Sequence, residues 1–286
     1  MPTTPSPRTL KQRLRAIPLL GDVLAWANAL LHLASLRQSH ARLQARLDAL
    51  APPAAVAAAD LDRFYVDFED RFRGSREDIK GRLRVYLPRL AHLAGRDAAT
   101  DAAPLAIDVG CGRGEWLELM AEHGIPAMGI DMNLAMVTAC RERGLAAQCD
   151  DAIAFLRKQP PGSLALVTGF HIIEHLPFDT LIALFDAALH ALRPDGAIIF
   201  ETPNPENLRV GACSFYTDPT HIHPIVPDVA AFMARQRGFA DTEILRLHPH
   251  APAEFLAGDD PAASLLNQTL LGARDFAVLA WKVRRP

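Results

Sequence analysis

The stretch DVGCGRGEW, residues 108–116, decides the fold prediction, because it joins an apolar run to a helical pattern through closely spaced glycines. Gly110, Gly112 and Gly114 stand at alternate positions. Since glycine has no Cβ, it adopts positive φ without strain and lets a ligand lie against the main chain. A strand that ends in such a turn predicts a nucleotide-like cofactor there, although similar turns also serve tight packing alone.

Strand-like and helical patterns alternate along most of the chain. Seven apolar runs are typical of strands, at residues 105–110, 127–132, 146–150, 164–170, 197–203, 242–248 and 275–283. Helical patterns between the first five runs begin near Glu115, Asn133, Ile153 and Phe178. Such alternation predicts an α/β fold with a doubly wound, mostly parallel sheet. No clear helix is predicted between the last two runs, which favours an antiparallel last strand.

Composition and charge limit the function classes. The chain has 286 residues, half of them apolar, which is ample for a large core. Its formal net charge of −3 gives no overall positive field, so we expect no nucleic-acid partner. The four cysteines include no CxxC pair, which favours reduced thiols and a cytoplasmic protein.

The first 50 residues differ from the rest. Basic residues precede a long apolar stretch within LKQRLRAIPLLGDVLAWANALLHLASL, residues 10–36. A membrane span or a signal peptide is disfavoured because Asp22 interrupts the apolar run. An amphipathic helix fits better, and apolar residues of 36–50 continue at coiled-coil spacing. We therefore expect residues 10–50 to make peripheral contact with the inner membrane face or to form a homo-oligomer. Packing on the chain's own domain is the open alternative.

Four segments follow from these patterns. They are an N-terminal amphipathic, coiled-coil-like helix at 1–50, a linker at 51–60, a helical lead-in at 61–103 and an α/β domain at 104–286. The lead-in is rich in aromatic and charged residues and has a turn at Gly74.

Carboxylates close the first three strand-like runs. Asp108 precedes the first glycine, Asp131 ends the second run, and Asp151 with its neighbour Asp150 follows the third. A carboxylate at the position of Asp131 commonly binds ribose hydroxyls. Three acids around one site would repel a pyrophosphate, and the glycine spacing is GxGxG instead of GxGxxG. The cofactor is therefore expected to be cationic or free of phosphate.

These residues resemble the class I S-adenosylmethionine-dependent methyltransferases. The resemblance covers about residues 105–249, and four motifs carry it in order: IDVGCGRGEW, GIDMN, CDDA and LALVTGFHIIEHL. It implies a Rossmann-like, seven-stranded sheet and S-adenosyl-L-methionine as cofactor. The cofactor-binding residues that it implies are Asp108, Gly110, Cys111, Gly112, Gly114, Asp131, Met132, Asp151 and Ala152.

A narrower resemblance is to methyltransferases of bacterial surface-polysaccharide biosynthesis, including O-antigen chain-terminating types. Its motifs are FEDRFRGSREDIKGRLRVYLP, ETPNPENL and FYTDPTHIHPI. It implies that the lead-in contributes to the cofactor site, where Arg73 or Arg82 could bind the cofactor carboxylate through a guanidinium fork. Alternatively, both arginines are solvated helix charges.

The histidines suggest how the methyl acceptor would be activated. A hydroxyl acceptor has a proton to lose, and histidine suits that task at neutral pH. His171 follows the fourth strand, where an acceptor would meet the methyl group, and is the first candidate base. His221 is the second, and either could instead be hydrogen-bonded structure. A sugar, phosphate, phenol or other small hydroxyl acceptor, including a glycan, is compatible with these side chains.

Two other functions remain open. HIIEH, residues 171–175, matches the HxxEH signature of zinc hydrolases, but that signature needs a helix and His171 directly follows an apolar strand. We therefore assign no metal ligand. A non-catalytic, methyltransferase-like interaction subunit is the other alternative, disfavoured because the expected cofactor residues are intact.

Overall fold

The computed structural model describes residues 38–40, 42–43, 58–93, 106–258 and 260–283. The chain divides into two compact units, residues 1–57 and 58–286. Residues 38–40 and 42–43 are helical. Otherwise, the predictions for residues 10–50 lie outside the described residues. Among the residues described, no helix combines the length and hydropathy needed to cross a membrane.

The second unit is built on a seven-stranded sheet with the order β3-β2-β1-β4-β5-β7-β6. Its strands are β1 (Ala106–Val109), β2 (Ala127–Asp131), β3 (Ala147–Cys149), β4 (Leu164–Phe170), β5 (Leu192–Pro203), β6 (Phe239–Leu247) and β7 (Asp275–Lys282). β1 pairs in parallel with β2 and β4, whereas β7 is antiparallel to both β5 and β6. The predicted mostly parallel sheet with an antiparallel last strand is confirmed.

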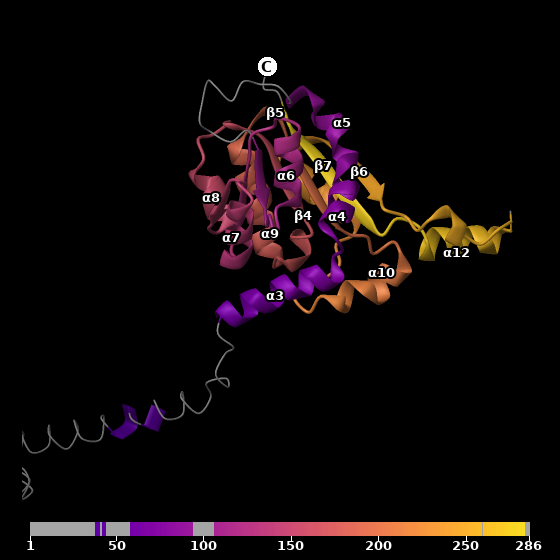
Figure 1. Ribbon diagram of the computed structural model, residues 1–286, viewed down its shortest axis with the longest axis horizontal. Coiled ribbons are helices and arrows are strands. Elements are labelled where there is room, and N and C mark those ends of the chain that lie inside the picture. The colour runs from indigo at the N-terminus through magenta and orange to yellow at the C-terminus, as the bar shows by residue number, and fades with distance from the viewer. Residues whose placement is uncertain (1–37, 41, 44–57, 94–105, 259, 284–286) are drawn as a thin grey trace, which may run out of the picture. The chain divides into compact units, whose positions relative to one another are not determined.

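Helices cover both faces of this sheet (Figure 1). The four predicted helices are present as α6 (Glu115–Glu122), α7 (Leu134–Glu142), α8 (Ala152–Lys158) and α9 (Phe178–Ala191). One face packs against α8, α9 and α11 (Pro227–Gln236) around Phe185 and Phe200. The other packs against α6 and the lead-in around Tyr86 and Trp116. Each face therefore buries its own apolar core, as a doubly wound sheet requires.

One expectation about the C-terminal part was wrong. A helix, α12 (Pro261–Leu270), does lie between β6 and β7. Asp260 caps it by accepting from the Ala262 N–H at 3.2 Å, and Pro261 occupies the first turn. None of its residues is buried, so its sequence lacks the strong apolar stripe of a core helix.

The lead-in consists of α3 (Ala58–Phe72), α4 (Arg76–Leu83) and short turns that end at Leu93. α3 begins inside the predicted linker, so residues 58–60 are helical. Gly74, with φ of +107°, makes the predicted turn between the two helices, and Ser75 caps α4. Ion pairs from Arg76 to Glu115 and Glu118 join α4 to α6.

The strand order reverses between β1 and β4, and this reversal marks where a ligand is expected to bind. β1 and β4 are neighbours, but the chain runs outward from β1 to β2 and β3 before it returns to β4. Ligands of doubly wound sheets bind beyond the carboxyl ends of the strands at such a point. The glycine loop after β1 and the HIIEH segment after β4 both lie there.

Candidate active site

The three loop glycines have different roles. Gly110, Gly112 and Gly114 all adopt positive φ, at +66°, +49° and +81°. A Cβ on Gly110 would lie 2.7 Å from Ile172 Cδ1, and one on Gly114 would lie 2.7 Å from Cys140 Sγ, so these two glycines permit close packing. A Cβ on Gly112 would instead face Glu69 Oε2 at 3.5 Å. Gly112 is thus the glycine that opens toward polar groups.

Asp108 lies beneath this loop and is only 3% exposed, so its carboxylate is almost closed to solvent. Its carboxylate accepts a hydrogen bond from Thr168 Oγ1 of β4 at 2.7 Å. Burial raises the pKa of Asp108 to about 7, although Thr168 and Arg73 act in the opposite direction. This carboxyl group therefore titrates near neutral pH.

Asp131 ties the end of β2 to the glycine loop. Its Oδ2 accepts from the Gly112 N–H at 2.9 Å, and its Oδ1 accepts from the Asn133 N–H at 2.8 Å. Each oxygen keeps a further lone pair. Met132 is exposed beside it.

The other predicted cofactor residues occupy the same edge of the sheet with different exposure. Asp151 is exposed and caps α8 by accepting from the Ala154 N–H at 2.6 Å, and Ala152 begins that helix. The Cys111 side chain is buried, and its Sγ would be 2.5 Å from a Cβ on Gly129. Only the main chain of Cys111 can therefore reach a cofactor.

Helix α3 closes over the glycine loop. Glu69 Oε1 accepts from Arg73 Nη1 at 2.9 Å, and Arg73 Nη2 donates to the Phe170 carbonyl oxygen at 3.1 Å. Arg113, within the loop, pairs with Asp70 of α3 at 2.7 Å. Arg73 is therefore bound at the loop and is not a freely solvated charge, whereas Arg82 lies further along, in α4.

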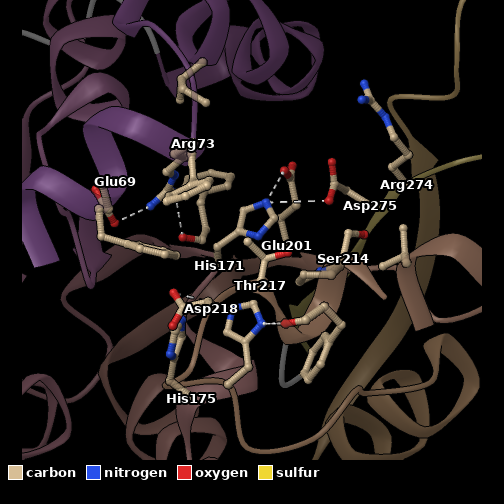
Figure 2. A pocket seen from close by; sticks show the side chains of 18 of the residues that line it. Glu69, Arg73, His171, His175, Glu201, Ser214, Thr217, Asp218, Arg274 and Asp275 are labelled. Carbon is tan, nitrogen blue, oxygen red and sulfur yellow. Dashed lines mark hydrogen bonds and ion pairs between the residues drawn. The ribbon is translucent and has the colours of Figure 1, made fainter. Parts of the chain in front are cut away.

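A cavity of about 320 Å³ extends from this point across the ends of β4, β5 and β7. Glu69, Arg73 and Phe170 line its end nearest the glycine loop. The other lining residues include His171 and Arg274, which Figure 2 labels. His221 and Arg82 also line it. Its size suits a small molecule.

His171 lies among three carboxylates, of which Figure 2 shows those of Glu201 and Asp275. Its Nδ1 is 3.3 Å from Glu174 Oε1, and its Nε2 is 3.4 Å from Glu201 and 3.7 Å from Asp275. Burial alone would lower the pKa of His171, but these carboxylates outweigh it and raise the pKa to about 10. At neutral pH the ring already carries its second proton. This environment does not suit the role of base predicted for His171.

His221 has a different environment. Its Nδ1 lies 2.6 Å from the Phe215 carbonyl oxygen, which can only accept, so Nδ1 carries the proton. Its Nε2 faces Glu174 Oε1 at 3.8 Å. His221 is the better placed of the two predicted bases, because its Nε2 lone pair is free when the ring is neutral.

The HIIEH segment is not one helix. His171 has φ of +57°, and only Ile173–His175 form a short turn of 3-10 helix. His171 faces Glu201 and Asp275, whereas the ring of His175 packs against that of His221 at a centroid distance of 4.6 Å. The zinc-hydrolase alternative therefore lacks the helix face that would align its two histidines.

Comparison with known proteins identifies the family. A family model described as a methyltransferase domain matches residues 76–244. The chain belongs to this family. It is a class I S-adenosylmethionine-dependent methyltransferase, an enzyme, and the alternative of a non-catalytic subunit is set aside.

Similar proteins include one solved structure and several curated enzymes. A crystal structure of a SAM dependent methyltransferase from Archaeoglobus fulgidus is 34% identical, with a TM-score of 0.69 over 77% of this chain and 100% of that one. A ubiquinone biosynthesis O-methyltransferase of Idiomarina loihiensis is 30% identical over 60% of this chain and 70% of its own. A second, of Methylococcus capsulatus, is 35% identical over 35% of this chain, which spans only 43% of that relative.

The sequence analysis did not predict three residues of the site, Glu69, Glu201 and Asp275. Glu69 lies four residues before Arg73 on a helical pattern, a spacing that favours ion pairs and could have indicated this partner. Asp275 opens β7 opposite Pro203, and only the antiparallel pairing brings it to this edge of the sheet. Glu201 follows an apolar run at the end of β5 and was predictable as an edge residue.

Proposed function

We propose that this methyltransferase transfers the methyl group of S-adenosylmethionine to a hydroxyl oxygen of a small acceptor held in the cavity. This assignment rests mainly on the cavity, because one cavity joins Glu69 and Arg73 at the glycine loop to His221. Both curated relatives are named O-methyltransferases, which supports oxygen as the atom that is methylated.

The residues at the glycine loop fit the cofactor. Glu69 is 7% exposed and its Oε2 accepts no hydrogen bond, so this buried oxygen suits an ammonium group. Asp131 has lone pairs for ribose hydroxyls, and Arg73, not Arg82, lies at the loop to bind a carboxylate. When bound, the cofactor supplies an electrophilic methyl group on a sulfonium sulfur.

The residues at the acceptor end favour loss of the hydroxyl proton. During methyl transfer the acceptor oxygen forms a bond to the methyl carbon as the carbon–sulfur bond breaks. The electron pair of the broken bond stays on sulfur. The hydroxyl proton passes to Nε2 of His221, a residue that lines the cavity and whose Nδ1 is bonded to the Phe215 carbonyl oxygen. Such help from a positioned base typically contributes about 100-fold or more to the rate.

A phenol-type hydroxyl is the acceptor class that fits best. Phe68, Phe170 and Phe215 line the cavity and provide apolar walls for a ring. A phenol has a pKa of about 10 and loses its proton more readily than a sugar hydroxyl. The relatives are named for ubiquinone biosynthesis, whereas a glycan acceptor has the support of the sequence resemblance alone.

Methyl transfer to a panel of acceptors tests this assignment. The full-length chain is incubated with S-adenosylmethionine carrying a labelled methyl group and with a catechol, a sugar with vicinal hydroxyls or a phosphate monoester. We expect label on a catechol oxygen with equimolar S-adenosylhomocysteine, and a rate about 100-fold lower in His221→Gln. His223→Gln, two residues away, is the matched control. Label on nitrogen or carbon, or on the phosphate alone, would contradict the assignment.

A further inference from the structure

We propose that Glu174, His175 and His221 bind a divalent transition-metal ion at the acceptor end of the cavity. One ligand atom from each of these residues lies within 4.8 Å of the other two. His175 and His221 also line the cavity, so an ion between them is accessible to a small molecule. No metal ligand was expected from the sequence, because the HxxEH signature needs a helix and His171 directly follows a strand; the cluster proposed here uses His221 in place of His171.

Hydrogen bonds fix the two imidazoles with their Nε2 lone pairs free. His221 Nδ1 donates to the Phe215 carbonyl oxygen at 2.6 Å. Thr220 Oγ1 donates its only proton to Asp218 Oδ1 at 2.6 Å, so it accepts from His175 Nδ1 at 2.9 Å. In its neutral form each ring therefore donates at Nδ1 and has its lone pair at Nε2. Metal-binding histidines are held in the same way, with the second ring nitrogen donating to a carbonyl, carboxylate or similar group.

Glu174 contributes a buried carboxylate oxygen to this cluster. This residue is 0% exposed, and its Oε2 accepts from Thr202 Oγ1 at 2.9 Å. Its Oε1 accepts no hydrogen bond of normal geometry, although His171 Nδ1 is 3.3 Å away. The same Oε1 also lies 3.8 Å from His221 Nε2, so it stands between the His171 imidazolium and the His221 ring. Two lone pairs that face each other in a buried site repel unless a proton or a cation lies between them.

The spacing and the donor types indicate which ion would bind. Tetrahedral coordination with bonds of about 2.1 Å brings ligand atoms to about 3.4 Å from each other, close to the 3.8 Å between His221 and Glu174. Two imidazoles and one carboxylate suit zinc, iron or manganese better than magnesium, which prefers oxygen ligands. Asp218 is less available, because its two oxygens already accept from Tyr65 and Thr220.

A second cluster, His171, Glu201 and Asp275, is a weaker candidate for the metal. Its imidazole lies between carboxylates and provides their counter-charge. Glu201 also accepts a hydrogen bond from Tyr86 and faces His248 at 3.7 Å. His171 pairs with Glu174 as well, but Glu201 has these two further partners, whereas Glu174 Oε1 has only His171 within ion-pair distance outside its own cluster among the described residues.

The ion would share in binding the acceptor. Because His175 and His221 line the cavity, an ion held by them would lie within reach of the acceptor and would supply Lewis-acid polarisation of its hydroxyl group. In the metal-bound enzyme His221 is then a ligand, and direct proton transfer to His221 applies to the metal-free enzyme. This role in the reaction rests on the proposed function, whereas binding of the ion does not.

Metal titration of the full chain, without an affinity tag and after dialysis against a chelator, tests the site. Calorimetry and elemental analysis are expected to show one Zn²⁺ per chain, competition by Mn²⁺ and much weaker binding of Mg²⁺. His221→Gln and Glu174→Gln are each expected to raise the Kd for Zn²⁺ more than about 100-fold, above the usual cost of losing a residue that only supports a ligand. His175→Gln takes the place of Glu174→Gln if circular dichroism shows that the latter does not fold.

Two variants serve as controls. His223→Gln removes a histidine from the same loop, and Asp275→Asn removes a carboxylate from the second cluster, so both are expected to leave zinc affinity unchanged. Absence of zinc and manganese binding, or loss of binding in Asp275→Asn with binding kept in His221→Gln, would overturn the site. Zinc binding without methyl transfer to any hydroxyl would contradict only the proposed function.

Discussion

His171 lies between carboxylates that come from three different segments of the chain. Glu174 belongs to its own loop, Glu201 to the end of β5 and Asp275 to the start of β7. A buried carboxylate is costly unless it is paired, and one imidazolium serves all three. The residue therefore acts mainly through its charge and holds the strand ends together under the cavity.

Replacing His171 with asparagine should mainly lower the free energy of unfolding and should affect the rate of methyl transfer less. Asparagine tolerates the positive φ at this position, so the main change is loss of the charge. Removing one partner of a buried ion pair costs about 3 kcal/mol. Urea denaturation at pH 6 measures the free energy of unfolding. Unchanged stability together with a loss of turnover of about 100-fold would return the role of base to His171.

Asp108 makes the stability of the cofactor-free protein depend on pH. The pKa of this carboxyl group rises from its usual 3.8 to about 7 on folding, mainly because of burial. Between these values the folded chain binds more protons than the unfolded chain, so the free energy of unfolding falls as pH rises from about 4 to about 7. The shift corresponds to about 4 kcal/mol, and Asp108→Asn is expected to lack this fall.

Urea titrations of both proteins at pH 5 and pH 8 measure this difference. Other groups titrate equally in the two proteins, so the comparison isolates Asp108. A parallel pH dependence in the wild type and the variant would show that Asp108 is ionised throughout.

Among the helices that the structure describes, α3 contacts the glycine loop and the end of β2, where we propose that the cofactor binds. Asp70 pairs with Arg113 of the glycine loop, and Asn133 Nδ2 donates to the Asp62 carbonyl oxygen at 3.1 Å. The helix thereby spans the ends of β1 and β2. Its side chains reach the loop from a segment that precedes the sheet in the chain.

Glu69→Gln is expected to weaken binding of S-adenosylmethionine. The variant keeps the shape of the side chain but removes the charge that suits an ammonium group. Loss of a charged hydrogen bond costs about 1.5 to 3 kcal/mol, a rise in Kd of roughly 10-fold to 100-fold. Glu77→Gln, on the exposed side of α4, is the matched control for calorimetry. Equal affinity of Glu69→Gln and the wild type would place the ammonium elsewhere.

The elements were predictable to different degrees. Apolar runs and the helical patterns between them predicted all seven strands and α6 to α9, because each repeats a local periodicity. α12 was missed since it buries none of its residues, and its cap at Asp260 with Pro261 was the remaining signal. The approach of Glu69 to Gly112 and the contacts of His171 with Glu201 and Asp275 depend on elements far apart in the sequence, so local patterns could not reveal them.

At the scale of the whole molecule, the chain consists of two units that the structure describes separately. Residues 58–286 contain the sheet, the glycine loop and the cavity. Contact of residues 10–50 with a membrane surface or with a second copy stays a prediction from the sequence.

Removing residues 1–57 is expected to leave the cofactor affinity of the second unit unchanged. The same deletion should release the protein from anionic vesicles or from its oligomer, because the basic and apolar residues of 10–50 are absent. Vesicle sedimentation and light scattering of both proteins measure this. Identical behaviour with and without the segment would mean that residues 10–50 serve neither contact.

S-adenosylmethionine is expected to bind at the end of β2, beside the glycine loop, with Asp131 as acceptor for its ribose hydroxyls. Calorimetric titration of the wild type and Asp131→Ala measures this, with Asp179→Ala, an exposed aspartate in the first turn of α9, as control. The loss of charged hydrogen bonds predicts a Kd that is roughly 10-fold to 100-fold higher in Asp131→Ala and unchanged in the control. Equal affinity in a folded Asp131→Ala variant, or tighter binding of NADH than of S-adenosylmethionine by the wild type, would contradict the account.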